Sequence, residues 1–412
     1  MGMIERRARV VITGIGPALA GSSDSDSFWN FLNLGTSQCS EMAHPYEQGR
    51  KIKVGAIRCY EPSVELNPPL NEDWFKNYPR QIQFYLASVM NAVKDSRWRI
   101  GELVGDKIGI YEGSSRGPHA YHRKQFHREE ELGPSKVHTT KSLIYGLAGQ
   151  AGAIAALNLG ATGPCISFNG GCTAAAVAAG YAFNDIQAGF VDQAVVTGHD
   201  FPLSTDILAT YLSSAIISTN GAHDSLENPY NNHRESNLIL GEGAMSMVFE
   251  NEHLALAQGR TILAEIDSVI NGTESSDVLK NGQDLKRVVK LFERCLARAN
   301  CALSDIDFVV GHGNGSVMSD CGEQMLREQI FGARSNSVPW ITTKPIYGHG
   351  LATSGVVNIA AATQILNRKT MFQNPISQPF TPPQSGQYRR GLAFSWGLGG
   401  KVSIASLKSY NP

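Results

Sequence analysis

Residues 163–176 read GPCISFNGGCTAAA, and this stretch decides the fold class. The run from Cys165 to Phe168 is typical of a strand, the Gly170-Gly171 pair predicts a tight turn, and the alanines after Thr173 favour a helix. A cysteine between a strand and a helix, on a sharp turn, resembles a nucleophile elbow, in which the turn exposes the thiol. The alternative is a small buried residue at the start of a helix.

The same pattern of an apolar run that ends in glycine recurs along the chain, with helical stretches between the runs. The runs lie at residues 10–16, 108–113, 194–198, 308–311 and 393–397, and the predicted helices at residues 80–94, 142–159, 173–187, 288–299 and 351–366. Strands that alternate with helices predict the α/β class.

The order of these elements suggests two similar halves. Each half opens with a strand, continues through strand and helix units, and contains a strand that leads into a glycine-rich turn. A polar break at residues 250–261 divides them, so we expect an N-terminal unit of residues 1–255 and a C-terminal unit of residues 256–412. The proline-rich segment 373–390 is predicted to be a loop.

Composition excludes several classes of protein. The 412 residues are 42% hydrophobic and 18% charged, which suits a large folded core. The 36 basic residues nearly balance the 37 acidic ones, which argues against a protein that binds nucleic acid or an anionic membrane surface. The chain has no long apolar run for a membrane span and no signal-peptide pattern at residues 1–7, so we expect a cytoplasmic protein.

The cysteines and one histidine-rich stretch do not indicate a metal site. Seven cysteines without a CxxC pair fit neither a disulfide framework nor a zinc ribbon. His119, His122 and His127 lie in a charged stretch, which favours an exposed loop or helix over metal ligands. We therefore predict no bound metal.

Two histidines are candidates for the chemistry. His312 and His349 are each flanked by glycines, and we place both near the ends of strands. Neutral imidazoles can donate N–H hydrogen bonds to a developing enolate or oxyanion without adding a full charge. The helix that follows Cys172 is expected to lower the thiol pKa and to offer N–H groups to an oxyanion. A lone histidine can equally be a satisfied structural residue.

Three further features are ambiguous from the residues alone. Lys344 precedes His349 and could pair with an acid, and Glu323 follows His312. Either could instead be a surface charge. The run GLGG at residues 397–400 could direct N–H groups at a ligand or be a plain turn.

Taken in order, these motifs resemble the β-ketoacyl-acyl-carrier-protein synthase family, the condensing enzymes of fatty acid and polyketide synthesis. Residues 163–172 resemble its active-site cysteine motif. Residues 311–316 (GHGNGS), with Asp320 and Glu323, resemble its first histidine motif, and residues 343–350 (TKPIYGHG) resemble its lysine and second histidine motif. The resemblance extends over nearly the whole chain.

This resemblance implies a thiolase fold, with two similar α/β halves in five layers and a dimer formed through the sheet edge. It implies that Cys172 accepts an acyl group from an acyl-carrier-protein thioester. His312 and His349 would then hold the thioester carbonyl of a malonyl carrier while CO2 leaves and the carbanion attacks acyl-Cys172. No resident cofactor is implied, because the phosphopantetheine arm of the carrier protein carries the substrate.

The resemblance also assigns supporting roles. The backbone N–H groups of Cys172 and Leu398 would form the oxyanion hole, with Gly397 and Gly399 shaping the turn around Leu398.

In the histidine region, Lys344 with Glu323 would order the two imidazoles. Asn314 and Ser316 stand where the family usually has threonines that contact the phosphopantetheine arm.

Several positions depart from the family pattern. Gly171 and Thr173 flank the cysteine where alanine or serine is more common, and Leu398 replaces a phenylalanine. Residues 234–237 (RESN) stand where the family has Arg-Asp-Gly-Phe. Because the cysteine and both histidines are intact, we expect an active enzyme with an altered acyl pocket, and we favour polyketide or secondary-metabolite synthesis over housekeeping fatty acid elongation.

The sequence leaves alternatives open for the dimer partner and for the class of protein. The protein could form a homodimer or a heterodimer with a second ketosynthase-like chain, and in such a pair it could be a catalytically weak subunit that sets chain length. Such subunits usually lack the cysteine. A coenzyme A thiolase would need a second catalytic cysteine near its C-terminus, and no cysteine follows Cys321. A thiol protease is disfavoured by the two Gly-His-Gly sites.

Overall fold

The computed structural model describes residues 8–68, 70–217, 229–230, 236–277, 281–282, 284–372 and 388–411. The strands are β1 (Val10–Leu19), β2 (Ser40–Ala43), β3 (Lys51–Gly55), β4 (Ile108–Ser114), β5 (Cys165–Asn169), β6 (Gln193–Asp200), β7 (Leu240–Gly241), β8 (Gly243–Asn251), β9 (Ala264–Thr273), β10 (Phe308–Val310), β11 (Trp340–Ile341), β12 (Arg390–Gly397) and β13 (Lys401–Lys408).

The α-helices cover both faces of the main sheet. They are α1 (Ser25–Leu34), α2 (Glu72–Asn77), α3 (Arg80–Asp95), α4 (His119–Leu132), α5 (Pro134–Val137), α6 (Thr140–Tyr145), α7 (Gln150–Leu159), α8 (Ala174–Gln187), α9 (Thr205–Ser213), α10 (Glu252–Ala257), α11 (Leu285–Arg298), α12 (Val317–Phe331), α13 (Lys344–Tyr347) and α14 (Thr353–Arg368). Within the described residues, no helix is both long and apolar enough to cross a bilayer.

The main sheet repeats one strand order twice. Its ten strands run β11-β10-β12-β13-β9-β1-β8-β6-β4-β5. Each half contributes five of these strands. When they are numbered in chain order within their half, both halves read third, second, fourth, fifth and first from the outer edge inward. The two first strands, β1 and β9, pair antiparallel where Val10 opposes Ile266. The expectation of two similar α/β halves is therefore confirmed.

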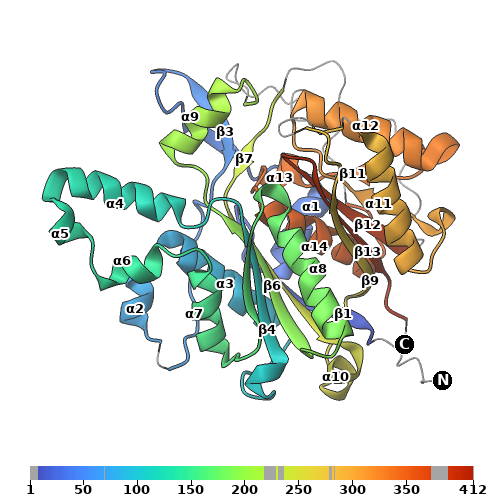
Figure 1. Ribbon diagram of the computed structural model, residues 1–412, viewed down its shortest axis with the longest axis horizontal. Helices are drawn as coiled ribbons and strands as arrows, with labels where there is room; N and C mark the ends of the chain where they lie inside the picture. The colour runs from blue at the N-terminus through green and yellow to red at the C-terminus, as the bar shows by residue number, and fades with distance from the viewer. Residues whose placement is uncertain are drawn as a thin grey trace.

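Two helices lie between the halves of this sheet. α8 and α14 contact each other and pack against strands of both halves, α8 against β4, β6 and β9 and α14 against β6, β8 and β12. α3 and α7 cover the outer face of the N-terminal half, and α11 and α12 lie on the outer side of the C-terminal half. Figure 1 shows α8 and α14 as the middle of the five layers.

Small residues allow these layers to approach closely. A Cβ placed on Gly198 of β6 would lie 2.7 Å from Ala175 Cβ of α8 and 2.9 Å from Thr353 Cα of α14. A Cβ on Gly355 of α14 would lie 2.9 Å from Ala176 Cβ. The alanine-rich sequence of α8 is thus explained by its position between two sheet halves, because larger side chains would push them apart.

Some sequence expectations need correction. The single helix predicted for residues 142–159 is wrong, because the chain breaks at Gly146–Gly149 between α6 and α7, and Gly149 adopts a left-handed φ of +86°. Of the loop predicted at 373–390, residues 373–387 lie outside the described residues. The boundary between residues 255 and 256 stays a prediction. It falls within α10, and residues 258–263 form the nearest connection between elements.

A small second sheet extends the fold toward the histidine region. Its order is β2-β3-β7, with β3 and β7 parallel. Leu240 of β7 also forms an isolated parallel bridge to His349. This sheet therefore fixes the backbone at one of the two candidate histidines.

We expect Gly198→Ala to lower the free energy of unfolding by about 1–3 kcal/mol, because the added methyl would overlap α8 and α14. Chemical denaturation measures this change. Gly170→Ala is the matched control, since its Cβ would meet nothing nearer than 3.8 Å. Equal stability of the two variants would contradict the close packing of the middle layer.

Candidate active site

Cys172 lies where the edge strand β5 turns into the central helix α8. β5 ends at Asn169, Gly171 turns the chain with φ of +67°, and a 3-10 turn over Gly171–Thr173 leads into the helix. Only glycine adopts this left-handed conformation without strain. The strand, turn and helix predicted from the sequence are confirmed, and they place the thiol at the N-terminus of α8.

His349 contacts this cysteine directly. Its Nε2 lies 3.1 Å from Cys172 Sγ, and its Nδ1 lies 3.0 Å from Ser354 Oγ in the first turn of α14. The placement of His349 near a strand end is wrong, because the short helix α13 precedes it and Gly348 reverses the chain with φ of +74°. The proline at the start of α13 suits a helix N-terminus, a signal that the strand interpretation overlooked.

His312 faces His349 from the C-terminal half. It follows β10, as predicted, and its ring centre lies 5.3 Å from that of His349 with the planes at 89°. Its Nε2 lies 3.3 Å from Asn314 Nδ2. Burial, aided by the charge of Lys344, lowers the pKa of His349 to about 3 and the pKa of His312 well below its usual value. Both imidazoles are therefore neutral at physiological pH.

Glu323 of α12 holds the backbone around His312. Its carboxylate accepts from the N–H groups of His312 and Gly313, both at 2.7 Å, and from Trp340 Nε1 at 2.6 Å and the Tyr230 hydroxyl at 3.1 Å. The side chain is fully buried. Burial raises the pKa of Glu323, although these donors and Lys344 oppose the shift. The geometry makes Glu323 a positioning residue for the His312 loop.

Lys344 has a different hydrogen-bond partner from the acid that the sequence suggested. Its Nζ donates to Asn358 Oδ1 of α14 at 2.9 Å. The Asn358 amide in turn donates to the carbonyls of Gly311 at 3.0 Å and Phe394 at 2.9 Å. Burial lowers the pKa of Lys344 to about 8, while the charge of Glu323 acts in the opposite direction. Sequence reasoning missed Asn358, since nothing near it in the sequence marks a buried amide inside a helix.

The expectation of a lowered thiol pKa is wrong. Burial, followed by the negative charge of Asp200, raises the pKa of Cys172 to about 12, and Lys344 opposes this only in part. In the resting protein Cys172 is thus a neutral thiol, and its reactivity depends on a base that takes the proton. His349 is the group in contact.

Asp200 is a second residue that sequence reasoning missed. It ends β6 and accepts hydrogen bonds from Ser114 Oγ at 2.9 Å, from the N–H groups of Ser115 and Arg116, and from the Ala352 N–H at 2.8 Å. It joins the turn after β4 to the segment between His349 and α14. An acid at the end of a predicted strand was the available signal.

An apolar wall lies beside the thiol. Leu203, Tyr211 and Leu212 belong to the same cluster as Cys172, and Tyr211 and Leu212 come from α9. Burial raises the pKa of Tyr211 to about 12, and the Arg116 side chain hydrogen-bonds this phenol. An acyl group on Cys172 would therefore meet both apolar and cationic neighbours on this side, a feature that the sequence patterns did not reveal.

The remaining predicted residues lie around the same centre. Gly397 ends β12, and a Cβ on it would lie 3.3 Å from Thr173, so the turn through Leu398 and Gly399 adjoins the cysteine. The Leu398 side chain is 58% exposed.

In the His312 loop, backbone N–H groups bind polar side chains. Asn314 N–H donates to Asp320 Oδ1 at 3.0 Å, and Ser316 N–H donates to Asn314 Oδ1 at 2.9 Å. Asn314 and Ser316 therefore hold the loop that leads into α12. Of residues 234–237, Arg234 and Glu235 lie outside the described residues.

The histidine-rich stretch forms the exposed helix α4 and makes no metal cluster with its neighbours. His119 Nε2 lies 2.6 Å from Asp206 Oδ2, and His122 Nε2 lies 2.9 Å from the Gly146 carbonyl. Across the part of the chain that the structure describes, no group of three or more potential ligands could hold a metal ion.

The arrangement combines a nucleophile with hydrogen-bond groups that carry no net charge. Cys172 can give its proton to His349, and two neutral imidazoles that face each other can bind one carbonyl oxygen. The chemistry that this set supports is acyl transfer to the thiol, followed by stabilisation of an enolate.

We expect Glu323→Gln to lower the free energy of unfolding by about 2 kcal/mol or more and to slow turnover at least tenfold, because an amide nitrogen would face donors that now have an acceptor. Denaturation and steady-state assays measure the two effects. Glu328→Gln, on the exposed side of the same helix, is the control and should change neither. Full activity of Glu323→Gln would mean that the carboxylate does not position His312.

Comparison with known proteins identifies the family of this chain. The model of the β-ketoacyl synthase N-terminal domain matches residues 7–254, and that of the β-ketoacyl synthase C-terminal domain matches residues 263–375. A Streptomyces cyaneus protein named as a polyketide β-ketoacyl synthase is 27% identical over 386 residues, covering 88% of this chain and 86% of its own length. A 3-oxoacyl-[acyl-carrier-protein] synthase 2 of Staphylococcus aureus is 24% identical over 371 residues, covering 89% and 87%.

Solved structures share the fold. The ishigamide ketosynthase/chain length factor superposes with a TM-score of 0.86 at 19% identity, covering 98% of this chain and 100% of that one. A type II polyketide ketosynthase in complex with its acyl-carrier protein gives a TM-score of 0.85 at 19% identity, with the same coverage. With the family models spanning most of the residues, this chain belongs to the β-ketoacyl synthase family of acyltransferases, which form carbon–carbon bonds.

Proposed function

We propose that Cys172 is the nucleophile of an active ketosynthase that condenses an acyl group with a malonyl unit held on an acyl carrier protein. The single observation that carries this is the 3.1 Å contact between Cys172 Sγ and His349 Nε2 at the start of α8. In the first step, His349 takes the thiol proton and the thiolate attacks the carrier thioester. The carrier thiolate leaves and recovers the proton from His349, so that acyl-Cys172 forms with no net change in charge.

In the second step, His312 and His349 bind the thioester carbonyl oxygen of the malonyl carrier. The carboxylate leaves as CO2, the electron pair of the broken C–C bond forms the enolate, and the enolate carbon attacks acyl-Cys172. The N–H groups of Cys172 and Leu398 face the resulting oxyanion in this proposal, and the intermediate collapses to the β-ketoacyl carrier and the free thiolate, which takes a proton from water.

His349 needs a different tautomer in each step, and the Ser354 hydroxyl can serve both. When Nε2 accepts the thiol proton, Nδ1–H can donate to Ser354 Oγ. When Nε2–H binds the carbonyl oxygen, the same hydroxyl can donate to Nδ1 across the 3.0 Å contact. Burial, together with the charge of Lys344 beside both rings, keeps the imidazoles neutral.

A basic groove supports a carrier-protein partner. The groove, of about 1570 Å³, runs between α2, α4, α5 and α6. Its cationic lining residues are Lys76, Arg80, Lys124, Arg128, Lys136 and Lys141. Arg80 already donates a hydrogen bond to Glu242, which is the acidic residue of this lining. The cationic side chains of α4 face the groove. Such a surface suits an anionic partner, and the phosphopantetheine arm carries a phosphodiester.

The free edge of β5 supports a dimer. β5 ends the main sheet, and Cys165, Ser167 and Asn169 are exposed along it. Phe168 of this strand stacks on the exposed Tyr181 at 4.7 Å. An uncovered strand edge flanked by an aromatic pair is a surface that another chain can extend. The partner in this proposal is a second copy of this chain or a ketosynthase-like chain, as in the ketosynthase/chain length factor pair.

We place the reaction in polyketide or secondary-metabolite synthesis, with housekeeping fatty acid elongation as the alternative. The relative from Streptomyces cyaneus and the cationic Arg116 beside the acyl wall support this assignment. The cytoplasmic location expected from the sequence remains a prediction.

Acyl loading tests the nucleophile. Incubation with a panel of acyl-carrier-protein thioesters should add one acyl mass to the intact protein, because the thiol can pass its proton to His349. Cys172→Ala should abolish the gain, while Cys165→Ala, on the exposed edge of β5, should retain it. No gain with any donor would favour the chain-length subunit instead.

Charge reversal tests the carrier surface. We expect the double variant Lys124→Glu with Arg128→Glu to raise KM for the malonyl carrier about tenfold or more with little change in kcat, since these cations attract the partner without touching the reacting atoms. Steady-state kinetics at two salt concentrations measure this. The exposed Lys290→Glu of α11 is the control. An unchanged KM in the double variant would move the docking surface elsewhere.

A further inference from the structure

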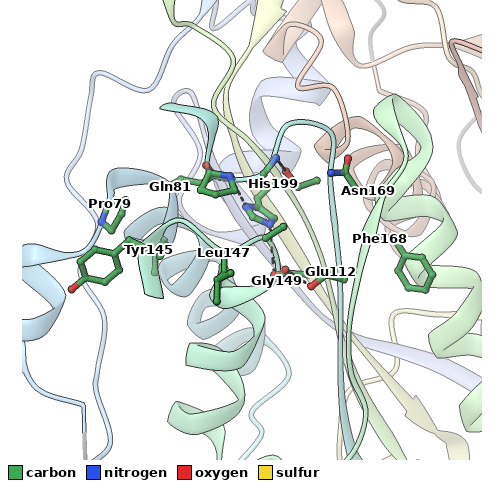
Figure 2. A pocket seen from close by; sticks show the side chains of 16 residues that line it. Pro79, Gln81, Glu112, Tyr145, Leu147, Gly149, Phe168, Asn169 and His199 are labelled. Carbon is green, nitrogen blue, oxygen red and sulfur yellow. Dashed lines mark hydrogen bonds and ion pairs between the residues drawn. The ribbon is translucent and has the colours of Figure 1, made fainter. Parts of the chain in front are cut away.

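A separate cavity lies on the outer face of the N-terminal sheet half, bounded by α3, the α6–α7 connection and the ends of β4, β5 and β6 (Figure 2). Cys172 and both catalytic histidines are absent from its lining. Glu112 and His199 share a sheet face with Ile110 and Val195, which pack against α3 and α7, whereas Cys172 leads into α8 on the opposite face. The cavity is therefore distinct from the site described above.

One end of the cavity carries a chain of buried polar groups. Gln81, His199 and Glu112 are all less than 9% exposed. Gln81 Nε2 lies 3.0 Å from His199 Nδ1, and His199 Nε2 lies 3.6 Å from Glu112 Oε2. Ser167 Oγ donates to Glu112 Oε1 at 2.6 Å. Figure 2 shows Gln81, His199 and Glu112 following one another, with dashed lines between them.

The carboxyl group at this end is ionised. Burial alone would raise the pKa of Glu112, but His199, Ser167 and the N–H of Gly152 in the first turn of α7 outweigh it and the net shift is downward. No lysine or arginine is among the described residues that line the cavity.

One acceptor atom at this end lacks a donor. Within the described residues, neither Glu112 Oε2 nor His199 Nε2 makes a hydrogen bond of standard geometry. The contact from His199 Nε2 to Oε2 is longer than a hydrogen bond. A buried carboxylate oxygen in this state is costly unless a donor joins it.

Apolar side chains line much of the rest of the cavity. Pro79 and Ile82 come from the start of α3, and Leu147 and Ala151 from the α6–α7 region. An apolar cavity with a few convergent polar groups is the usual form of a small-molecule site.

We propose that this cavity binds a small molecule with an apolar body and a protonated primary amine, whose ammonium group lies against Glu112. An ammonium supplies the donors that Glu112 Oε2 lacks and a positive charge opposite its carboxylate. A hydroxyl would supply a donor without the charge, and a carboxylate would be repelled. The proposal does not rest on the function of Cys172, so either can fail without the other.

The test compares three probes with one alkyl chain and different head groups: hexylamine, 1-hexanol and hexanoate. Isothermal titration calorimetry on the full-length protein should give hexylamine a Kd at least tenfold below that of 1-hexanol and no binding of hexanoate. Glu112→Gln should remove the preference for the amine and leave 1-hexanol unchanged. Glu130→Gln, an exposed acid on α4, should behave as the unmodified protein.

A second variant guards against a misfolded Glu112→Gln protein. Ala148→Trp adds bulk at the exposed rim and should weaken hexylamine and 1-hexanol alike, while Cys172-dependent acyl loading and the melting temperature stay unchanged. Equal affinity for amine and alcohol, tighter binding of hexanoate, unchanged amine binding in Glu112→Gln, or no binding of any probe would each overturn the proposal.

Discussion

The close packing of α8 and α14 is the constraint on which the site depends. α8 begins directly after Cys172, and α14 begins just after His349, so the contact of these two helices determines where the two reacting groups meet. Gly198 of β6 and Gly355 of α14 permit the approach, because a Cβ on Gly198 would overlap both helices and a Cβ on Gly355 would overlap α8. His312 comes from the loop before α12 and completes the set from the C-terminal half. The repeated topology of the sheet thus brings residues 177 positions apart in sequence within 3.1 Å.

Burial is the second determinant, since it keeps the reacting groups uncharged. The thiol has a pKa of about 12, and both imidazoles are neutral because burial and Lys344 oppose their protonation. Hydrogen bonds hold the nearby charged groups away from the reacting atoms. Lys344 donates to Asn358, Glu323 accepts from backbone and side-chain donors, and Asp200 accepts from the turn after β4. Proton transfer between neutral groups avoids the creation of an isolated charge in a buried site. This arrangement suits a reaction in which the thiolate forms only as its proton passes to His349 and the later negative charge develops on substrate oxygen.

Sequence patterns predicted much of this arrangement, and the exceptions have physical reasons. The Gly-Gly turn before Cys172 and the strand before His312 are local signals, so both positions were predictable. Asn358 was not, because its role comes from contacts with Lys344, Gly311 and Phe394, which are distant in sequence.

The prediction of a lowered thiol pKa was wrong for a related reason. The helix N-terminus after Cys172 is visible in the sequence, but the depth of burial and the approach of Asp200 are not. The interruption at Gly146–Gly149 was hidden within an apolar stretch that has helical periodicity on both sides. The polar chain from Gln81 to Glu112 likewise joins three elements that no sequence motif connects.

The most direct test of the central claim is the rate at which iodoacetamide alkylates Cys172 as a function of pH, followed by peptide mass spectrometry. Iodoacetamide reacts with the thiolate, so a neutral, buried thiol with a pKa of about 12 predicts a rate that rises steadily from pH 6 to pH 10 without a plateau. A plateau with an apparent pKa below 8 would show a resting thiolate. It would contradict the account in which His349 must first take the proton from a neutral thiol.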